Sequence, residues 1–277
     1  MSSNSVSPTV LVAKSSDGIT TVTINRPQVR NCVNRSTALL LADAFRDFDR
    51  DESQKALVLA GAGGNFCSGY DLAEVAASRG ATDKHGPPAQ PVDVINGANG
   101  PMGPSRMSLS KPVIAAVSGY AVAGGLELAL LADMRVVDKS AIFGVFCRRF
   151  GVPLIDGGTV RLSKIVGYGR AMDMVLTGRA VGAEEALSFG LANRVVDTGH
   201  AVDAALELAR DIARFPQKCM RADLSSMHYA AYEASSLEDA LRYEFHGGSQ
   251  VVQEESVEGA TKFTKGIGRS GSFDAKF

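Results

Sequence analysis

The stretch SGYAVAGGLELALLA, from Ser118 to Ala132, decides how the rest of the chain is interpreted. It begins with small residues and a glycine pair, Gly124 and Gly125, and continues as a run of helix-forming residues whose single charge is Glu127. Leucine and alanine surround that charge on every face of the expected helix, and a helix that is apolar all round is normally buried. A buried carboxylate must find a partner, take up a proton or take part in chemistry.

The glycines directly before Glu127 add a second chemical feature. They leave backbone N–H groups free at a helix N-terminus, where a negatively charged oxygen is favoured. The stretch therefore predicts an anion-binding amide and a carboxyl group of raised pKa close together in space. A structural interpretation stays open, because the helix macrodipole also stabilises an acidic residue in a first turn.

Composition places the chain among ordinary globular proteins. Its 277 residues, with 45% hydrophobic and 21% charged residues, are enough for one large domain or for one domain with a smaller appendage. The net charge of −1, with scattered Lys and Arg, argues against a nucleic-acid or anionic-membrane partner. No apolar run reaches the roughly 18 residues that a membrane span needs. We therefore expect no nucleic acid and no membrane as partner.

The cysteines and the N-terminus predict a cytoplasmic protein. The opening residues MSSNSVSPTV lack the basic and apolar regions of a signal peptide. The four cysteines, Cys32, Cys67, Cys147 and Cys219, lie far apart and form no CxxC pair. They are typical of free thiols in a reducing compartment.

Short apolar runs alternate with helical patterns along the chain, which predicts an α/β core. Strands are expected at 9–13, 19–24, 55–59, 113–117, 134–137, 142–146 and 193–196. Helices are expected at 35–50, 71–78, 126–131, 159–166, 170–176, 183–189, 201–214, 218–232, 237–245 and 254–265. Asn34 is a candidate N-cap for the first of these helices, and Ser236 with Asp239 resembles a capping box.

Four regions are expected: a disordered N-terminus at 1–8, an α/β core at 9–197, a C-terminal helical region at 198–265 and a loose tail at 266–277. The segment from Gly80 to Pro104 is rich in Gly, Pro and Asn. A loop of this length is usually a lid or a disordered segment, and here it would shape a substrate pocket.

Several common catalytic and cofactor motifs are absent. GAGGNF, at 61–66, lacks the last glycine of the dinucleotide fingerprint, so a nucleotide-dependent oxidoreductase is a weak hypothesis. The sequence has no P-loop, no HExxH and no GxSxG, and its four histidines lack metal-ligand spacing. We expect no metal site.

Two glycine-turn-helix units stand out: FCSGYDL at 66–72 and KPVIAAVSGYAVAGGLELA at 111–129. Followed by Phe143-Gly, GGTVRL at 157–162 and GLANRVV at 190–196, they closely resemble the enoyl-CoA hydratase/isomerase (crotonase) family. The resemblance runs in order from about Val10 to Phe263. It implies a crotonase-like α/β spiral of ββα units with a C-terminal helical oligomerisation region, assembled as a homotrimer or a dimer of trimers. It also implies a coenzyme A thioester as substrate, no prosthetic group and a role in fatty acid metabolism.

The resemblance assigns the catalytic positions residue by residue. The backbone N–H groups of Tyr70 and Gly124 would polarise the thioester carbonyl of an acyl-CoA and stabilise its enolate. One such donor lowers a barrier by roughly 2.7–4 kcal/mol when it points at the developing oxyanion. Glu127 matches the first of the two glutamates with which hydratases of this family add water.

The resemblance also implies a coenzyme A site. The carbonyl of Ser68 matches the group that reads the adenine, and Asp71 and Leu72 belong to the same turn. Arg30 is a candidate for the coenzyme A phosphates, although it could equally be a surface arginine. Phe263 matches an aromatic residue that contacts coenzyme A in the neighbouring subunit.

One departure limits the functional prediction, because Cys147 stands where the second glutamate is expected. A thiol has a pKa of about 8.5, against about 4.3 for Glu, and is mostly protonated at neutral pH. Arg148 and Arg149 would lower it if they faced the thiol; otherwise Cys147 is a small buried residue. Asp156 is the other candidate acid or base, with helix N-capping as its structural alternative.

The leading hypothesis is thus an acyl-CoA lyase that hydrates a 2-enoyl-CoA, with Glu127 as the principal acid and base. Decarboxylation or thioester hydrolysis, using Glu127 with Asp156, is the alternative within the same chemistry. A non-catalytic acyl-CoA-binding oligomer is the alternative from another class.

Overall fold

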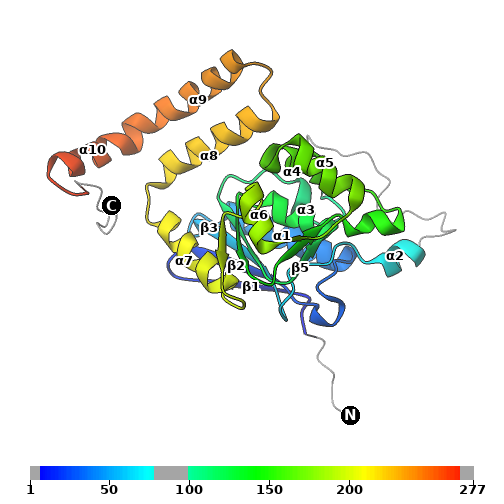
Figure 1. Ribbon diagram of the computed structural model, residues 1–277. Helices are drawn as coiled ribbons and strands as arrows, with labels where there is room; N and C mark the ends of the chain where they lie inside the picture. The colour runs from blue at the N-terminus through cyan, green and yellow to red at the C-terminus, as the bar shows by residue number, and fades with distance from the viewer. Residues whose placement is uncertain (1–6, 78–98, 269–277) are drawn as a thin grey trace, which may run out of the picture.

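The computed structural model describes residues 7–77 and 99–268 (Figure 1). The expectations for residues 1–6, for most of the segment from 80 to 104 and for 269–277 lie outside the described residues. An α/β core carries a pair of long C-terminal helices that extends away from it, so the predicted fold class is confirmed (Figure 1).

The core is organised on a six-stranded sheet of order β1-β2-β3-β4-β6-β9. β1 and β2 form the predicted antiparallel hairpin, with Val12 opposite Val22. From β2 onward every pair of neighbours in this sheet is parallel. The strands are β1 (Val10–Lys14), β2 (Ile19–Ile24), β3 (Ala56–Gly61), β4 (Val113–Val117), β6 (Met134–Asp138) and β9 (Arg194–Val196).

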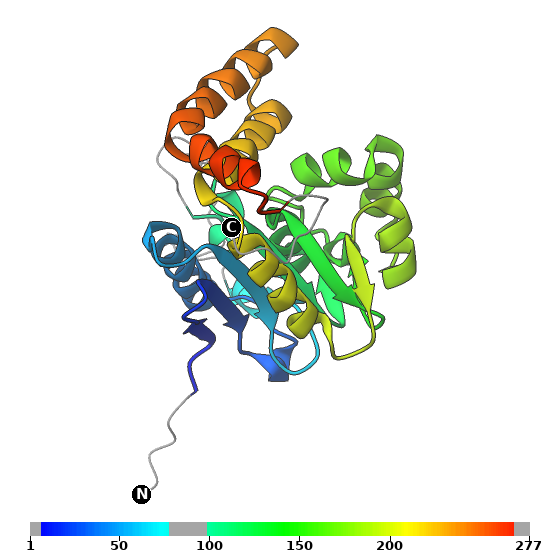
Figure 2. The ribbon, with the colours of Figure 1, turned by 90° about the vertical axis from the view of Figure 1, so that its left-hand side faces the viewer.

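The central strands are buried on both faces, as parallel strands with near-continuous apolar runs should be. Alternate residues point to opposite faces, so Leu57 packs in the large cluster with Phe45 of α1 (Arg35–Arg50). Val58 packs on the other face, in the cluster with Ala205 of α7 (Ala201–Ala213). Figure 2 shows α7 lying across this second face.

A smaller three-stranded sheet of order β5-β7-β8 lies beside the first. It consists of β5 (Tyr120–Val122), β7 (Ile142–Gly144) and β8 (Val181–Gly182). The sequence did not indicate β5 or β8, because each is too short to show an alternating pattern. The strand expected at 142–146 ends at Gly144, and the 3₁₀ helix η3 (Phe146–Phe150) follows.

The other predicted core helices follow in the expected order: α2 (Leu72–Ala77), α3 (Gly124–Leu131), α4 (Gly158–Val166), α5 (Tyr168–Thr177) and α6 (Ala183–Phe189). Two short 3₁₀ helices, η1 (Pro27–Val29) and η2 (Pro104–Arg106), were not predicted. Asn34 caps α1 as predicted, because its side chain accepts a hydrogen bond from the Thr37 N–H. No helix in the described ranges is both long and apolar enough to cross a membrane.

The C-terminal region contains α8 (Gln217–Tyr232) and α9 (Leu237–Val251). A π-helical turn at Val252–Ser256 joins α9 to α10 (Val257–Thr264), so the prediction of two separate helices at 237–245 and 254–265 is wrong. The missed link contains Gly247 and Gly248, which weaken the helical signal in the sequence.

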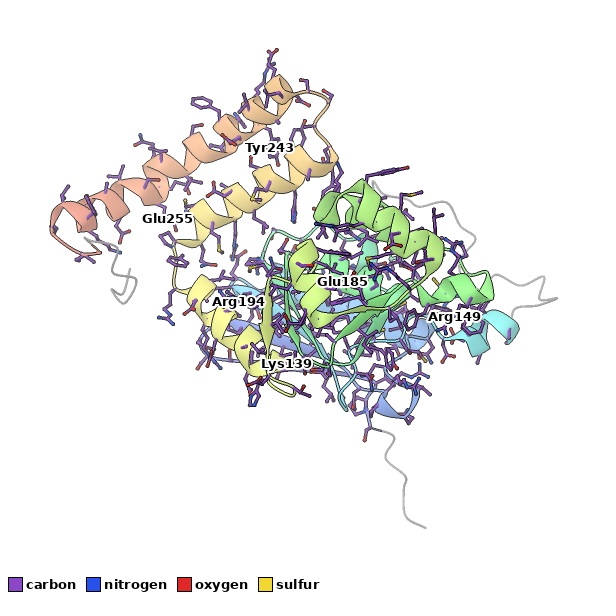
Figure 3. All side chains as sticks on the ribbon, viewed as in Figure 1. Lys139, Arg149, Glu185, Arg194, Tyr243 and Glu255 are labelled. Carbon is purple, nitrogen blue, oxygen red and sulfur yellow. The ribbon has the colours of Figure 1, made fainter. Side chains whose placement is uncertain are left out.

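Several contacts hold α8 against α9 and the π-helical turn that follows it. The ring of Tyr243 stacks on that of Tyr229 with centroids 4.0 Å apart, and Glu255 accepts a hydrogen bond of 2.7 Å from the N–H of Cys219 at the start of α8. Figure 3 shows Tyr243 and Glu255 towards opposite ends of this pair. Ser236 caps α9, as predicted, through a hydrogen bond from the N–H of Asp239.

Candidate active site

The start of α3 is built on an unusual backbone conformation. Ala123, directly before the helix, has φ of 54° and ψ of −125°, a region that side chains rarely adopt. Its N–H donates to the Gly144 carbonyl of the small sheet, which holds it there. A Cβ atom on Gly125 would lie 2.0 Å from the Cys67 carbonyl oxygen, so only glycine lets α3 approach this turn. The strained turn directs the N–H of Gly124 away from any helical partner.

A second glycine turn lies directly against the first. Gly69 has φ of 103°, and a Cβ atom on it would lie 3.0 Å from the Gly124 nitrogen. The backbone of Val33 pairs with the residues on either side of Tyr70, accepting from the Asp71 N–H and donating to the Gly69 carbonyl. Within 7–77 and 99–268, no hydrogen bond uses the N–H of Tyr70 or that of Gly124. Two unpaired amides therefore lie on adjoining turns.

The Glu127 carboxyl lies one helical turn beyond Gly124 and is only 2% exposed. Its Oε1 atom accepts hydrogen bonds from the backbone N–H groups of Asp156 and Gly158, both at 2.8 Å. Burial, and then repulsion from the Asp156 carboxylate, raise the pKa of Glu127 from 4.5 to about 7. The two amides favour the ionised form, but the loss of hydration outweighs them.

Asp156 is a second buried carboxyl group, 3% exposed. Its Oδ1 atom accepts hydrogen bonds from the N–H of Met102, at 3.0 Å, and from the hydroxyl of Ser105. Burial raises its pKa above the ordinary value. The capping alternative is wrong, because Gly157 holds the N-cap position of α4 and the Asp156 carboxylate bonds to Met102 and Ser105 instead.

Cys147 is buried beside these carboxyl groups, in η3. Burial and then the neighbouring Glu127 carboxylate raise the pKa of its thiol, and the opposing effect of Arg148 is smaller. The thiol therefore stays protonated at neutral pH. This contradicts the alternative in which neighbouring arginines activate it.

These groups share a cavity of about 710 Å³. The predicted catalytic residues Tyr70, Gly124, Glu127 and Asp156 all line it. Ser68, Leu72 and Arg30, predicted for coenzyme A, line it as well, as does Cys147. Its size fits an extended small molecule.

A sequence profile described as enoyl-CoA hydratase/isomerase matches residues 14–267. The chain belongs to this family. It is 34% identical over 252 residues to an enoyl-CoA hydratase of Mycobacterium tuberculosis, covering 88% of this chain and 89% of that protein. It is 36% identical over 208 residues to a protein of Arabidopsis thaliana named probable enoyl-CoA hydratase 1, peroxisomal, covering 75% and 74% of the two chains. The crystal structure of an enoyl-CoA hydratase from Mycobacterium marinum matches with a TM-score of 0.81 at 33% identity, over 93% of this chain and 96% of that one.

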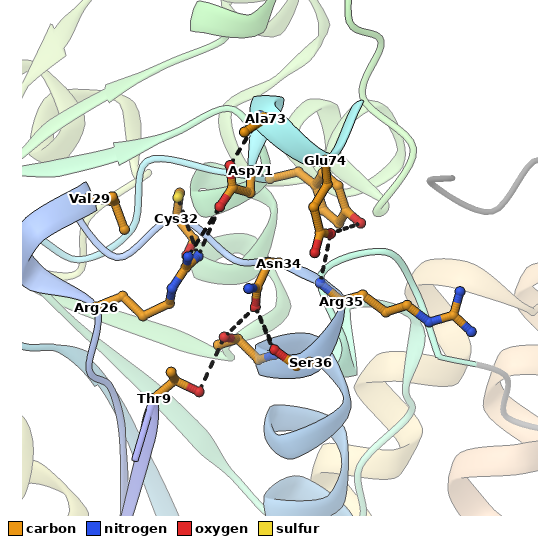
Figure 4. Close-up of polar contacts among 12 residues, drawn as sticks. Thr9, Arg26, Val29, Cys32, Asn34, Arg35, Ser36, Asp71, Ala73 and Glu74 are labelled. Carbon is orange, nitrogen blue, oxygen red and sulfur yellow. Dashed lines mark hydrogen bonds and ion pairs between the residues drawn. The ribbon is translucent and has the colours of Figure 1, made fainter. Parts of the chain in front are cut away.

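Two residues predicted for the coenzyme A site lie outside the cavity of this crotonase-family chain. Asp71 pairs with the Arg26 guanidinium at 3.2 Å and accepts from the N–H of Ala73, as Figure 4 shows. Phe263 is 56% exposed, on α10.

The hydroxyl of Tyr70 donates to Glu74, which also accepts from the backbone of Arg35 (Figure 4).

The sequence did not reveal a pair of aromatic rings on the cavity wall that has an arginine at either end. The guanidinium of Arg30 lies 5.4 Å from the ring centroid of Tyr120, whose ring lies 6.4 Å from that of Phe146. Arg149 in turn stacks over Phe146 at 4.7 Å. Phe146 and Arg149 both belong to η3, but Arg30 and Tyr120 come from distant segments, so spacing along the chain does not indicate this arrangement. In the part of the chain that the structure describes, no group of three or more His, Cys, Asp or Glu is placed to hold a metal ion.

Proposed function

We propose that this chain is a hydratase-type lyase that adds water reversibly to a 2-enoyl-CoA thioester. One observation carries the proposal: Glu127, with its pKa raised to about 7, lines the same cavity as the unpaired N–H groups of Tyr70 and Gly124. A carboxyl group with a pKa near the working pH transfers protons in both directions. Two N–H groups on adjoining turns can both donate hydrogen bonds to one thioester oxygen and stabilise it as it becomes negatively charged.

The two amides would act first on the thioester carbonyl. Its oxygen would accept hydrogen bonds from the N–H groups of Tyr70 and Gly124, which withdraw electrons from the conjugated double bond. Because Ala123 and Gly69 fix these N–H groups before substrate arrives, little reorganisation is needed as charge develops. The hydroxyl of Tyr70 is bonded to Glu74, so only the backbone of this residue is assigned to this role.

The carboxyl group would then move the protons. Ionised Glu127 takes a proton from water, the water oxygen bonds to C3, and the electron pair of the double bond moves through C2 to the carbonyl oxygen. The enolate collapses as C2 takes a proton from Glu127, or from protonated Asp156, which then recovers a proton from Glu127. The sum is one water added across C2 and C3.

Asp156 is the better candidate for the second acid and base. It lines the cavity, its pKa is raised by burial, and it acts electrostatically on Glu127. Cys147 has a thiol of raised pKa, which makes it a poor proton donor or acceptor at neutral pH.

The coenzyme A moiety would occupy the outer part of the cavity. The carbonyl of Ser68 would read the adenine, with Asp71 and Leu72 in the adjoining turn, and Arg30 would bind phosphate. The Arg30 guanidinium lies over the ring of Tyr120, and its N–H groups would bind anions. Phe263 would contact coenzyme A bound to a neighbouring subunit. No prosthetic group enters this chemistry.

The chain would assemble as a homotrimer or a dimer of trimers through its C-terminal helical region, residues 198–265. Large apolar side chains exposed on these helices support this, including Met227 at 73%, Leu237 at 75% and Phe245 at 76%. Light scattering after size exclusion would test the assembly. We also propose a cytoplasmic location and a role in fatty acid metabolism.

The substitution of Cys147 for the second family glutamate leaves room for decarboxylation or thioester hydrolysis by Glu127 with Asp156. The deciding experiment is turnover of crotonyl-CoA alongside longer, branched, malonyl-type and saturated acyl-CoAs. Hydration of at least one 2-enoyl-CoA, faster than any loss of CO₂ or release of free coenzyme A, supports the proposal. Tight binding without turnover of any substrate would instead support an acyl-CoA-binding oligomer.

A further inference from the structure

One peptide group connects Glu127 to a cation outside the cavity. The N–H of the peptide between Ile155 and Asp156 donates to Oε1 of Glu127 at 2.8 Å. The carbonyl of that same peptide accepts a hydrogen bond of 2.9 Å from Nη2 of Arg106, in η2. The guanidinium, the peptide and the carboxyl group therefore form an unbroken series of hydrogen bonds.

A second arginine holds the next peptide. Nη1 of Arg161, in α4, donates to the Asp156 carbonyl at 3.2 Å and to the Ser105 carbonyl at 2.7 Å. Ser105 in turn bonds through its hydroxyl to the Asp156 carboxylate. A Cβ atom on Gly157 would lie 2.4 Å from Nη1, so glycine makes room for this guanidinium. Arg161 thus links the 155–158 segment to Ser105, the residue whose hydroxyl contacts the Asp156 carboxylate.

We propose that Arg106 and Arg161 are positioning residues that fix the 155–158 segment against Glu127 and set the proton affinity of the Glu127–Asp156 pair. This rests on the proposed function, in which that pair transfers the protons. Neither arginine would touch substrate, because neither lines the cavity that contains Glu127.

Two physical effects carry the inference. A guanidinium on a carbonyl polarises the peptide, which makes its N–H a stronger donor to a carboxylate on the other side. The positive charges also favour the ionised forms of the two carboxyl groups. Both effects oppose the burial that raises their pKa values. Loss of either arginine should therefore raise the pKa values of the pair.

The charged and titratable groups around the pair and around Arg161 come from several packed elements. Asp156 and Arg161 act on Glu127, which itself acts on Cys147. Arg106 and Arg161 act on Asp156, and Tyr232 and Asp133 act on Arg161. Arg106 and Arg161 are the cations among them that also bond to the 155–158 segment.

The test compares Arg106→Met, Arg161→Met and Arg161→Lys in the full-length, ligand-free protein. Infrared difference spectra during a pH titration report protonation of Glu127, whose carbonyl band is assigned by its loss in Glu127→Gln. We expect each Met variant to raise the midpoint by at least about 0.5 pH unit, because an adjacent charge typically shifts a carboxyl pKa by more than that. The Lys variant, which keeps the charge, should restore the midpoint.

Activity provides the second measurement. For the Met variants we expect the whole pH profile of kcat/KM to move to higher pH, and kcat to fall more than KM rises. Arg161→Lys should have the same pH profile as the wild type but a lower kcat than the wild type, since an ammonium group cannot reproduce the fixed geometry of a guanidinium. Arg106 is half-buried, so its Met variant is expected to fold even if Arg161→Met does not.

Arg135 provides a matched control. It is also a buried arginine that donates to backbone carbonyls, those of Leu191, Ala129 and Ala132, but it belongs to β6 and contacts the C-terminal end of α3, away from Glu127. Arg135→Met should lower the melting temperature and leave the Glu127 midpoint unchanged.

An unchanged midpoint and pH profile in stably folded Arg106→Met and Arg161→Met would overturn the inference and leave both residues with a purely structural role. An equal shift in Arg135→Met would also overturn it, since the effect would then be general. The infrared midpoint needs no substrate. If no 2-enoyl-CoA is hydrated while the midpoints shift as expected, the proposed reaction fails and the positioning effect on the carboxyl pair stands.

Discussion

The Oε1 atom of Glu127 lies 2.8 Å from the backbone nitrogen of Gly158, the first residue of α4. The carboxyl group therefore occupies the N-terminus of a helix other than its own, where the helix dipole favours the ionised form. Its pKa is nevertheless raised to about 7, so loss of hydration outweighs the dipole and both amides. A carboxylate held in this way is fixed in position and still able to take up a proton.

Gly158→Ala should displace Glu127 and lower kcat. A Cβ atom at this position would lie 2.8 Å from Cγ and 2.9 Å from Oε1 of Glu127, so the carboxyl group or the helix must move. Small displacements of catalytic groups are costly, and we expect kcat to fall by roughly tenfold or more. Steady-state kinetics with a 2-enoyl-CoA measures the effect.

Gly169→Ala provides the control for that change. Gly169 lies near the start of α5, and among the described residues no atom outside its chain neighbours and its own helix backbone lies within 4 Å of the position that its Cβ would take. Alanine should raise the free energy of unfolding by up to about 1 kcal/mol and leave kcat unchanged. Equal kinetics in Gly158→Ala and Gly169→Ala would contradict the described contact with Glu127.

The wild type should lose stability, relative to Glu127→Gln, as the pH rises from 5 to 8. Between pH 4.5 and about pH 7 the folded protein keeps the Glu127 proton, whereas the unfolded chain has released it. The free energy of unfolding therefore falls as the pH rises. The loss in the free energy of unfolding is about 3 kcal/mol at most. Glu127→Gln should not show it, because glutamine does not titrate. Urea unfolding at both pH values measures it. Parallel pH dependence of the two proteins would mean that the pKa of Glu127 is not raised.

Arg30→Met should weaken the use of coenzyme A thioesters selectively. If its guanidinium binds phosphate, kcat/KM for crotonyl-CoA should fall roughly three- to tenfold, a magnitude typical of one partly exposed charged contact. Crotonyl-pantetheine, which lacks the adenosine and its phosphates, should be unaffected. Arg170→Met is the matched control, because Arg170 also stacks on an aromatic ring, that of Phe189 at 4.8 Å. An equal loss with both thioesters would remove Arg30 from phosphate binding.

Cys147→Ala should leave hydration nearly unchanged, because burial keeps the thiol protonated and inert. Cys147→Glu should raise the rate if the site lacks only a second carboxylate beside Glu127. Initial rates with crotonyl-CoA measure both. Loss of activity in the Ala variant, with an unchanged melting temperature, would give the thiol a chemical role.

Local patterns were enough to predict most of the fold. The hairpin of β1 and β2, the Asn34 cap and the helices of the core follow from apolar periodicity and capping residues, and the structure confirms them. Pairing between distant segments is not a local property, which is why β5 and β8 were missed. The break expected after Phe245 was wrong, because contacts with α8 outweigh the low helix propensity of two glycines.

The sequence predicted several of the residues that line the candidate site, but not the contacts between them. The sequence indicated Glu127 and Asp156 separately, but the hydrogen bond between the Asp156 backbone and Glu127 joins segments 29 residues apart. Asp156 was open to a capping interpretation because its contacts, Met102 and Ser105, lie more than 50 residues away in the chain. Arg161 lies within the matched GGTVR motif, which was the one available signal for it. Its role became visible only through its carbonyl partners.

The most direct test of the central proposal is the rate of crotonyl-CoA hydration by the wild type and by Glu127→Gln, measured at the pH optimum of the wild type. Glutamine keeps the shape of the side chain and can accept the same two amide hydrogen bonds, so the site should remain assembled. We predict that the wild type hydrates crotonyl-CoA and that the variant is slower by roughly 10²–10⁴-fold, the usual contribution of a general acid–base group. Equal rates in the two proteins would contradict the assignment of Glu127 as the group that moves the protons.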